Sequence, residues 1–205
     1  MAIISNAVTI ADAGAFSVSL GSKILIKEIT ASADATISFV HGTDGVVLDS
    51  TYPIYQFEFI NIHPANDTVE FQFQGDTGTN TNYNQTITST YFRAFHDEGD
   101  TGTGLAYHGA SDQAQGTEYQ DLTDDVGNGN DESMAGSLFL YNPSSSVFVK
   151  HFMASTTDYN SNDHNLTQHI AGYFNTTSPI TRISFKFEAG NIDAGKIKLY
   201  GIKDS

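Results

Sequence analysis

Hydrophobic and polar residues alternate along most of this chain, which is the period of a β-strand with one buried face. Between residues 55 and 59, for example, three aromatic residues alternate with Gln56 and Glu58. Strands are expected near residues 22–30, 36–40, 55–62, 69–74, 87–95, 136–141, 147–154, 168–174, 180–187 and 196–202. About ten short strands bounded by turn residues predict an all-β fold, an antiparallel β-sandwich of jelly-roll-like form.

Two breaks in the pattern predict how strands connect. The turn residues 64–67 and 142–146 each lie between two alternating segments, so we expect a hairpin at each. Both turns contain an X-Pro pair that follows an apolar strand, which suggests an internal repeat. At Ile60 and Ile62 the apolar residues change face, which predicts a β-bulge or a strand that crosses to the other sheet.

The alternation also divides the chain. Residues 1–20 are weakly patterned and are expected to form an N-terminal arm, followed by a single sandwich domain over 21–205. Residues 97–132 are acidic and rich in Gly, Asn and Gln, and we expect a long irregular surface excursion there, with a short strand or helical turn near 116–122. Its expected anchors are Leu105, Tyr107, Tyr119, Leu122 and Val126. We expect the arm and the excursion to contact other subunits.

Composition and charge exclude several classes of protein. The chain has 14 Phe and 10 Tyr but no Cys, so its core is aromatic and no disulfide or thiolate is available. A formal charge of −15 repels nucleic acid and anionic membranes. No apolar run reaches the roughly 20 residues of a membrane helix, and residues 1–5 lack the basic residues of a secretory signal. We therefore expect a soluble protein made in the cytoplasm.

No arrangement of residues predicts catalysis. The histidines follow no metal-binding spacing, and His63 and His151 are interpreted as hydrogen-bonded structural residues. Three acidic pairs, at 97–98, 124–125 and 131–132, would serve glycoside cleavage only with two carboxyls held about 5–10 Å apart across a sugar, which the sequence does not establish. We expect no catalytic residue and no cofactor.

The sequence contains a candidate calcium site and a candidate glycan site, and each also has a simpler interpretation. The segment 124–132 resembles one copy of a calcium-binding nonapeptide repeat, and its candidate ligands are Asp125, Asn128 and Asp131. A single copy is also explained as a solvated acidic loop, because such repeats work by stacking. Four tyrosines expected on loops would stack on sugar rings or fill an oligomer interface: Tyr83, Tyr107, Tyr119 and Tyr159. A glycan ligand is therefore kept as an alternative.

Four strings of sequence resemble a known group of proteins. They are FEFINIHPAND, TYFRAFHDE, LFLYNPSSSVFVKHF and GYFNTTSPITRISFKFEAGNIDAGKIKLYGIK, which together span most of residues 55–203. They resemble virion structural proteins of marine tailed phages, cyanophages in particular. This resemblance implies a virion component synthesised in the host cytoplasm, and it supplies no catalytic residues.

Two functions follow as expectations. The first is a non-enzymatic decoration or cement protein on the capsid exterior, which binds the major capsid protein or other virion proteins and forms a homo-oligomer, either a trimer or a dimer. The alternative is a module of a tail fibre or baseplate that binds a host glycan, because one fold serves many functions.

Overall fold

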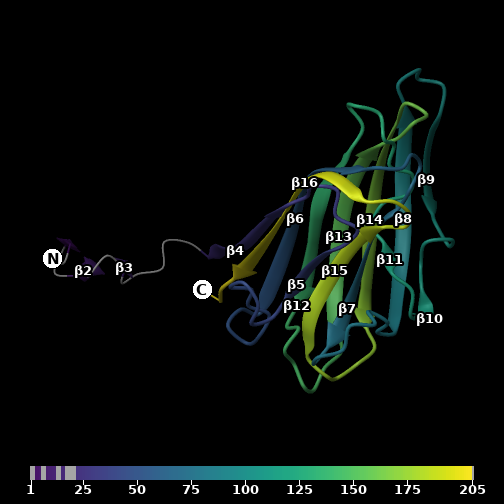
Figure 1. Cartoon of the computed structure of the whole chain (residues 1–205). Coiled ribbons are helices and arrows are strands. Elements are labelled where there is room, and N and C mark those ends of the chain that lie inside the picture. Colours follow the sequence, from purple (N-terminus) through teal and green to yellow (C-terminus); the bar gives the residue numbers. More distant parts are fainter. Residues whose placement is uncertain (1–2, 6–7, 13–14, 17–21, 205) are drawn as a thin grey trace.

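The computed structural model describes residues 3–5, 8–12, 15–16 and 22–204. Within 22–204 every regular element is a β-strand, and the strands form two antiparallel sheets that face each other (Figure 1). The expected all-β sandwich is therefore confirmed, whereas its jelly-roll-like form stays a prediction. None of the described residues belongs to a helix long and apolar enough to cross a membrane.

The two sheets differ in size. The larger one has nine strands in the order β10 (Ala114–Gly116), β8 (Ile87–Asp97), β14 (His164–Phe174), β13 (Lys150–Tyr159), β12 (Met134–Tyr141), β6 (Ile54–Pro64), β16 (Ile192–Ile202) and β4 (Lys23–Thr30), with β9 (Thr103–Tyr107) also paired to β8. The smaller one has the order β11 (Gln120–Asp121), β7 (Phe71–Thr77), β15 (Ile180–Phe187) and β5 (Ile37–Val40). The smaller sheet covers one face of the larger one and leaves the other face open.

The expected N-terminal arm is described only in part. Its strands β1 (Ile3–Ser5), β2 (Val8–Asp12) and β3 (Ala15–Phe16) pair with one another as a small antiparallel sheet. Residues 1–2, 6–7, 13–14 and 17–20 lie outside the described residues. A role of the arm in subunit contacts stays a prediction.

Phenylalanine side chains from both sheets fill the interior. The ring of Phe185 on β15 lies at the centre, with its centroid 5.1 Å from that of Phe57 and 5.3 Å from that of Phe59 on β6. Most of these rings meet edge to face, which is the favoured geometry of aromatic pairs. The period-two pattern thus identified the core correctly.

The change of face at Ile60 and Ile62 marks a bulge. Asn61 has a positive φ of 49°, Ile60 is exposed and Ile62 is fully buried. The register of both neighbouring strands shifts at this level, between Met134 and Gly136 on β12 and between Ala194 and Lys196 on β16. Strand β6 stays in the larger sheet, so the bulge is the correct alternative of the two.

Of the two expected hairpins, only one exists. Strands β12 and β13 pair directly, as predicted. Strands β6 and β7 lie in different sheets, so the predicted hairpin at 64–67 is wrong, and this turn carries the chain across the sandwich instead. The side chains that suggested pairing meet through the core, where the rings of Phe59 and Phe71 are 5.4 Å apart. The suggested internal repeat fails for the same reason.

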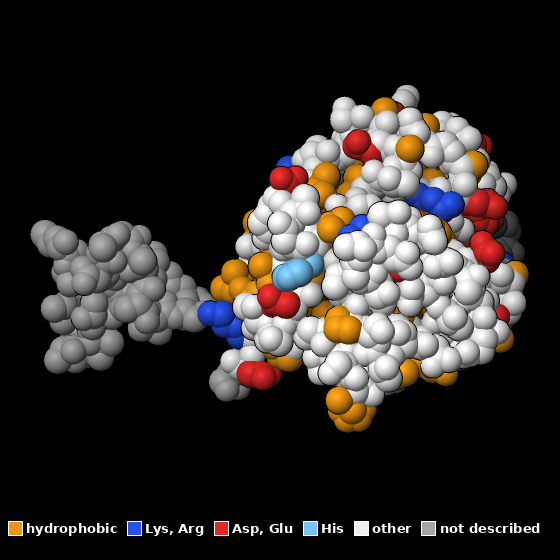
Figure 2. Space-filling model, turned by 60° about the horizontal axis from the view of Figure 1, so that its bottom comes forward, with side chains coloured by type: hydrophobic (Ala, Val, Ile, Leu, Met, Phe, Trp, Pro, Cys, Tyr) orange, Lys and Arg blue, Asp and Glu red, His pale blue; other side chains and the backbone are white. Residues whose placement is uncertain are grey.

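One end of the sandwich carries the loops 41–53, 78–86, 142–149 and 175–179, and it faces the viewer in Figure 2, where most of the surface is uncharged. The loop 142–149 projects there with Val147 and Phe148 about two-thirds exposed. Its base is fixed by the buried Lys150, whose Nζ donates to the carbonyl of Phe148 (2.8 Å) and to that of Thr176 (3.0 Å). The loop is therefore anchored although its tip is exposed.

The segment 97–132 is packed against the sandwich along much of its length. It contains β9, β10 and β11, so a short strand does form near 116–122. The expected anchors Leu122 and Val126 are fully buried, but Leu105 and Tyr107 are exposed on β9, so these two were wrongly assigned as anchors. Much of the segment is held instead by polar side chains. Gln74 Nε2, for example, donates to the carbonyls of Gln85, Thr117 and Glu118.

Candidate functional site

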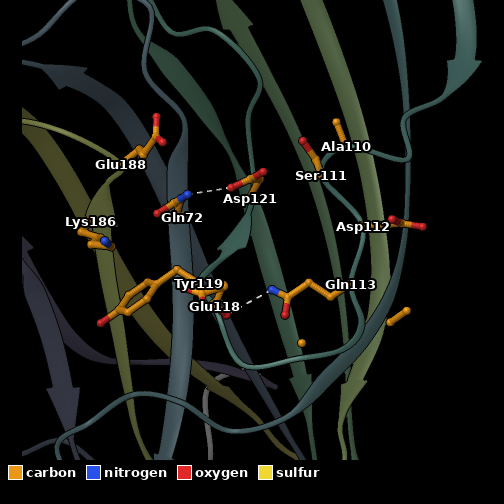
Figure 3. A pocket seen from close by; sticks show the side chains of 12 residues that line it. Gln72, Ala110, Ser111, Asp112, Gln113, Glu118, Tyr119, Asp121, Lys186 and Glu188 are labelled. Atoms are coloured by element: carbon orange, nitrogen blue, oxygen red, sulfur yellow. Dashed lines mark hydrogen bonds between the residues drawn. The ribbon is translucent and has the colours of Figure 1, made fainter.

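A polar groove lies beside the outer face of the smaller sheet, bordered by β7, β15 and the segment 110–121, which pairs with β7 through β11 (Figure 3). It has a volume of about 530 Å³. Its lining consists of Gln72, Ala110, Ser111, Asp112, Gln113, Ala114, Gly116, Glu118, Tyr119, Asp121, Lys186 and Glu188. The groove offers mainly carboxylate, amide and hydroxyl groups and therefore suits a polar ligand.

Carboxyl groups crowd at one end of this groove. Gln72 Nε2 donates to Asp121 Oδ1 at 2.8 Å, and burial raises the pKa of Asp121. The neighbouring Glu70 has a pKa raised to about 7, first by burial and then by its hydrogen bond with Glu188. Because Glu70 and Glu188 contact each other directly, they do not have the 5–10 Å separation that glycoside cleavage requires. This pair does not form the site of a glycosidase.

The opposite wall of the groove is formed by Gln113 and Tyr119. Gln113 Nε2 donates to the carbonyl of Glu118 at 3.1 Å, and its Oε1 is buried without a hydrogen-bond partner among the described residues. The Nζ of Lys186 lies 4.7 Å from the centre of the Tyr119 ring. The wall thus places an aromatic ring beside amide and carboxylate groups, and such a ring packs against the C–H face of a sugar.

The three calcium candidates do not form a recognisable cage. The side-chain amide of Asn128 donates to the carbonyl of Ala65 at 3.3 Å, and Asp131 is exposed. The carboxylate that closes this loop is that of Glu132, which accepts from the backbone N–H of Gly129. Within residues 22–204 no group of three or more His, Asp or Glu side chains is arranged to hold a metal ion. Calcium binding by Asp125, Asn128 and Asp131 stays a prediction.

The acidic pairs contact different partners, and Asp97 and Glu132 bind the local backbone. Asp97 Oδ1 accepts from the backbone N–H groups of Thr101 and Gly102, and these bonds together with that from the Thr101 hydroxyl lower its pKa to about 2. Asp124 forms an ion pair with Arg93 and lies 3.4 Å from His108 Nε2. We find no two of the predicted pairs joined in one site among the described residues.

The two histidines that were assigned structural roles differ. His63 Nε2 lies 3.1 Å from the carbonyl of Gly129, as expected for a structural residue. His151 is exposed on β13, and its ring contacts that of Tyr173 on β14 at 5.9 Å. His151 is therefore part of the outer surface of the larger sheet, which the sequence interpretation missed.

Comparison with protein-family models, with curated proteins and with solved structures found no match to this chain.

The outer face of the larger sheet is divided into a charged and an uncharged half. On β4, β16 and β6, Glu28 pairs with Lys196 at 2.8 Å and with Lys198 at 3.4 Å, and Lys23 pairs with Glu58. These ion pairs occupy one half of the face. They leave few charges without a partner there.

The other half, on β12, β13, β14, β8 and β9, carries no charged side chain facing outward among its described residues. Strand alternation points the following side chains outward: Ser137, Phe139, Tyr141, His151, Met153, Ser155, Thr157, Asn165, Thr167, His169, Ala171, Tyr173, Thr88, Thr90, Phe92, Ala94, His96, Thr103, Leu105 and Tyr107. We call this surface the uncharged face. Met153 is 54% exposed, and Phe92, Leu105 and Tyr107 are also exposed.

Proposed function

We propose that this chain is a non-enzymatic structural subunit of a tailed-phage virion, a decoration protein of the capsid exterior that contacts the major capsid protein. The resemblance of residues 55–203 to marine phage structural proteins supplies this context. The observation that carries the proposal is the uncharged face, because the chain has a charge of −15 and yet the outward side of these five strands carries no Asp, Glu, Lys or Arg among the described residues.

Such a face is suited to burial against protein. The cores of protein interfaces are depleted of charged residues and enriched in aromatic residues and Met. The uncharged face has this composition, with Phe92, Phe139, Tyr141, Met153 and Tyr173 directed outward. Elsewhere the acidic charge keeps the subunits soluble before assembly and disfavours contact with packaged DNA. The sandwich thus serves as a subunit of an assembly.

A map of the intact virion tests this function. We expect density for the sandwich on the outside of the capsid, at junctions between capsomers. Particles that lack the chain should lose resistance to heat and osmotic shock. Density at the tail instead of the head would overturn the decoration role, and unchanged resistance would remove the cement role.

A second function is favoured by the groove beside Gln113 and Tyr119. Its aromatic ring and polar lining fit a neutral saccharide, as in a tail-fibre or baseplate module that binds a host glycan. The acidic lining disfavours an anionic sugar.

A glycan array with the wild-type protein and the variant Tyr119→Ala tests this alternative. We expect the variant to lose binding at least tenfold, whereas Tyr141→Ala, which changes a tyrosine outside the groove, should keep it. An array without any bound neutral saccharide would exclude the adhesin function.

A further inference from the structure

The uncharged face combines a protruding side chain and a hollow at neighbouring positions. Met153 on β13 pairs in register with Ala171 on β14, and Ala171 pairs with Thr90 on β8. Met153 is more than half exposed, whereas the small side chain of Ala171 leaves a depression beside it. A knob and a hollow therefore lie about one strand spacing, roughly 4.8 Å, apart.

Larger side chains form the walls around this depression. One hollow of about 410 Å³ is lined by Tyr141, His151 and Tyr173 together with Met153 and Ala171. A second hollow of about 340 Å³ is lined by Phe92 and His169 together with the same two residues. The lining of both hollows is mostly apolar. The shape and the apolar lining of this surface are therefore those of a surface that packs against protein.

From this geometry we infer that the occupant of the uncharged face is a second copy of this chain, in a two-fold symmetric dimer whose axis passes between β13 and β14. In a two-fold interface each contact between residues i and j occurs twice. A knob beside a hollow satisfies that condition, because Met153 of each copy enters the depression at Ala171 of the other. Methionine is flexible enough to adapt to such a hollow.

The charge distribution selects the same face. Two copies of a chain that carries −15 repel each other, and this repulsion is smallest where neither copy presents charge. On the adjacent half of the sheet, Glu28 and Glu58 are already paired with lysines of their own chain. At the β9 edge of the uncharged face, Asp100 contacts His96 and Asp112 accepts from Tyr107, so these carboxylates too have partners in their own chain.

The area is sufficient for a stable dimer. Five strands with about 4.8 Å spacing and four rows of outward residues with about 7 Å spacing cover roughly 600 Å². Two copies would bury about 1,200 Å² in total, which lies at the lower end of the range for specific interfaces. The inference rests on the proposed function only in treating this face as an interface, and in the dimer the contact with the capsid falls on other surfaces of the sandwich.

Sedimentation equilibrium of the purified full chain is the first test, and we expect a dimer in the micromolar range. The variant Met153→Lys should weaken association more than about tenfold, because it places a charge at the centre of the interface. Leu25→Lys is the matched control, since Leu25 is 50% exposed on β4, faces the same side as Tyr200 on the charged half of the face, and receives the same substitution. It should leave the dimer intact.

Cross-linking supplies a test of geometry, because the chain contains no cysteine. Two preparations, Met153→Cys and Ala171→Cys, are mixed under oxidising conditions. We expect a disulfide-linked pair of one copy of each variant, formed faster than in either preparation alone. Mixing Leu25→Cys with Ala171→Cys should give little of this product.

The outcomes separate the two proposals. A monomer or a trimer in solution, or no selective cross-link, would overturn the two-fold dimer. If the monomeric chain is still found on the capsid exterior, the decoration function stands without it. If the dimer forms but the chain is absent from the capsid, the decoration function fails and the dimer stands.

Discussion

Asp158 shows how one buried side chain links the local pattern to stability. It is 2% exposed on β13, one of its oxygens accepts from Gln168 Nε2, and the other has no hydrogen-bond partner among the described residues. Burial raises the pKa of Asp158 to about 7. The alternation of β13 that places Phe152 and Ala154 inside continues to Thr156 and Asp158, so this placement was readable from the sequence. The predicted strand nevertheless ends at residue 154, because Thr156 and Asp158 are polar and do not continue the apolar pattern.

The pKa of Asp158 predicts a pH-dependent stability. The pKa of Asp158 in the folded chain, about 7, lies above its ordinary value of 3.8. Its contribution to the free energy of unfolding is therefore complete below pH 4 and is lost as the pH rises through 7. The variant Asp158→Asn cannot ionise and keeps an acceptor for Gln168. We expect it to raise Tm by about 5 °C at pH 8, on the order of 2 kcal/mol, with little gain at pH 4. Calorimetry at both pH values measures this.

The control for this comparison is Asp131→Asn, which removes an exposed carboxylate. It should change Tm similarly at both pH values. An equal effect of Asp158→Asn at pH 4 and pH 8 would contradict a raised pKa at this position.

At the scale of strands, the sequence predicted which segments are extended but not always which strands pair. The period of two gives the buried face of β6 and of β7, and both faces are correct. It does not say whether two successive strands share a sheet or face each other, because both arrangements bury the same side chains. Likewise β9 was missed because its apolar residues, Leu105 and Tyr107, are exposed at the edge of the sheet.

The groove was missed for a related reason. Its residues come from β7, β15 and the segment 110–121, which are distant in sequence and follow no motif. Tyr119, which the sequence offers as a candidate for sugar stacking, does lie in the groove. The uncharged face was detectable in part, since the strands near 136–141, 147–154 and 168–174 contain few charged residues. That these strands lie side by side in one sheet could not be predicted from the sequence.

Gln74 anchors the excursion, and its replacement should loosen residues 111–120. It is fully buried, and its Nε2 donates to the carbonyls of Gln85, Thr117 and Glu118. The variant Gln74→Met leaves these carbonyls without this donor, at a cost of about 2 kcal/mol. We expect faster hydrogen exchange in residues 111–120, measured by mass spectrometry.

Gln72→Met on the same strand serves as the control. Gln72 is less buried than Gln74, and its Nε2 donates to the carboxylate of Asp121 and not to a backbone carbonyl. It should have a smaller effect on exchange in residues 111–120. Equal exchange rates in both variants would show that the segment is held by other contacts.

For the molecule as a whole, the charge of −15 opposes any association of copies. Raising NaCl from about 20 to about 200 mM shortens the screening length from roughly 20 to about 7 Å. We therefore expect the proposed dimer to become tighter by several-fold, measured by sedimentation. An interface held by ion pairs would weaken instead, so the direction of the change identifies the kind of contact.

The anchored loop 142–149 has a practical consequence. Ser146 is exposed at its tip, while Lys150 fixes its base to the neighbouring loop through Thr176. A foreign peptide inserted after Ser146 would begin and end in a loop whose base is held in place. Insertions at such exposed loop tips reduce the stability of a fold only slightly. The tip thus provides a position for displaying an epitope or an enzyme on this sandwich in a fixed orientation.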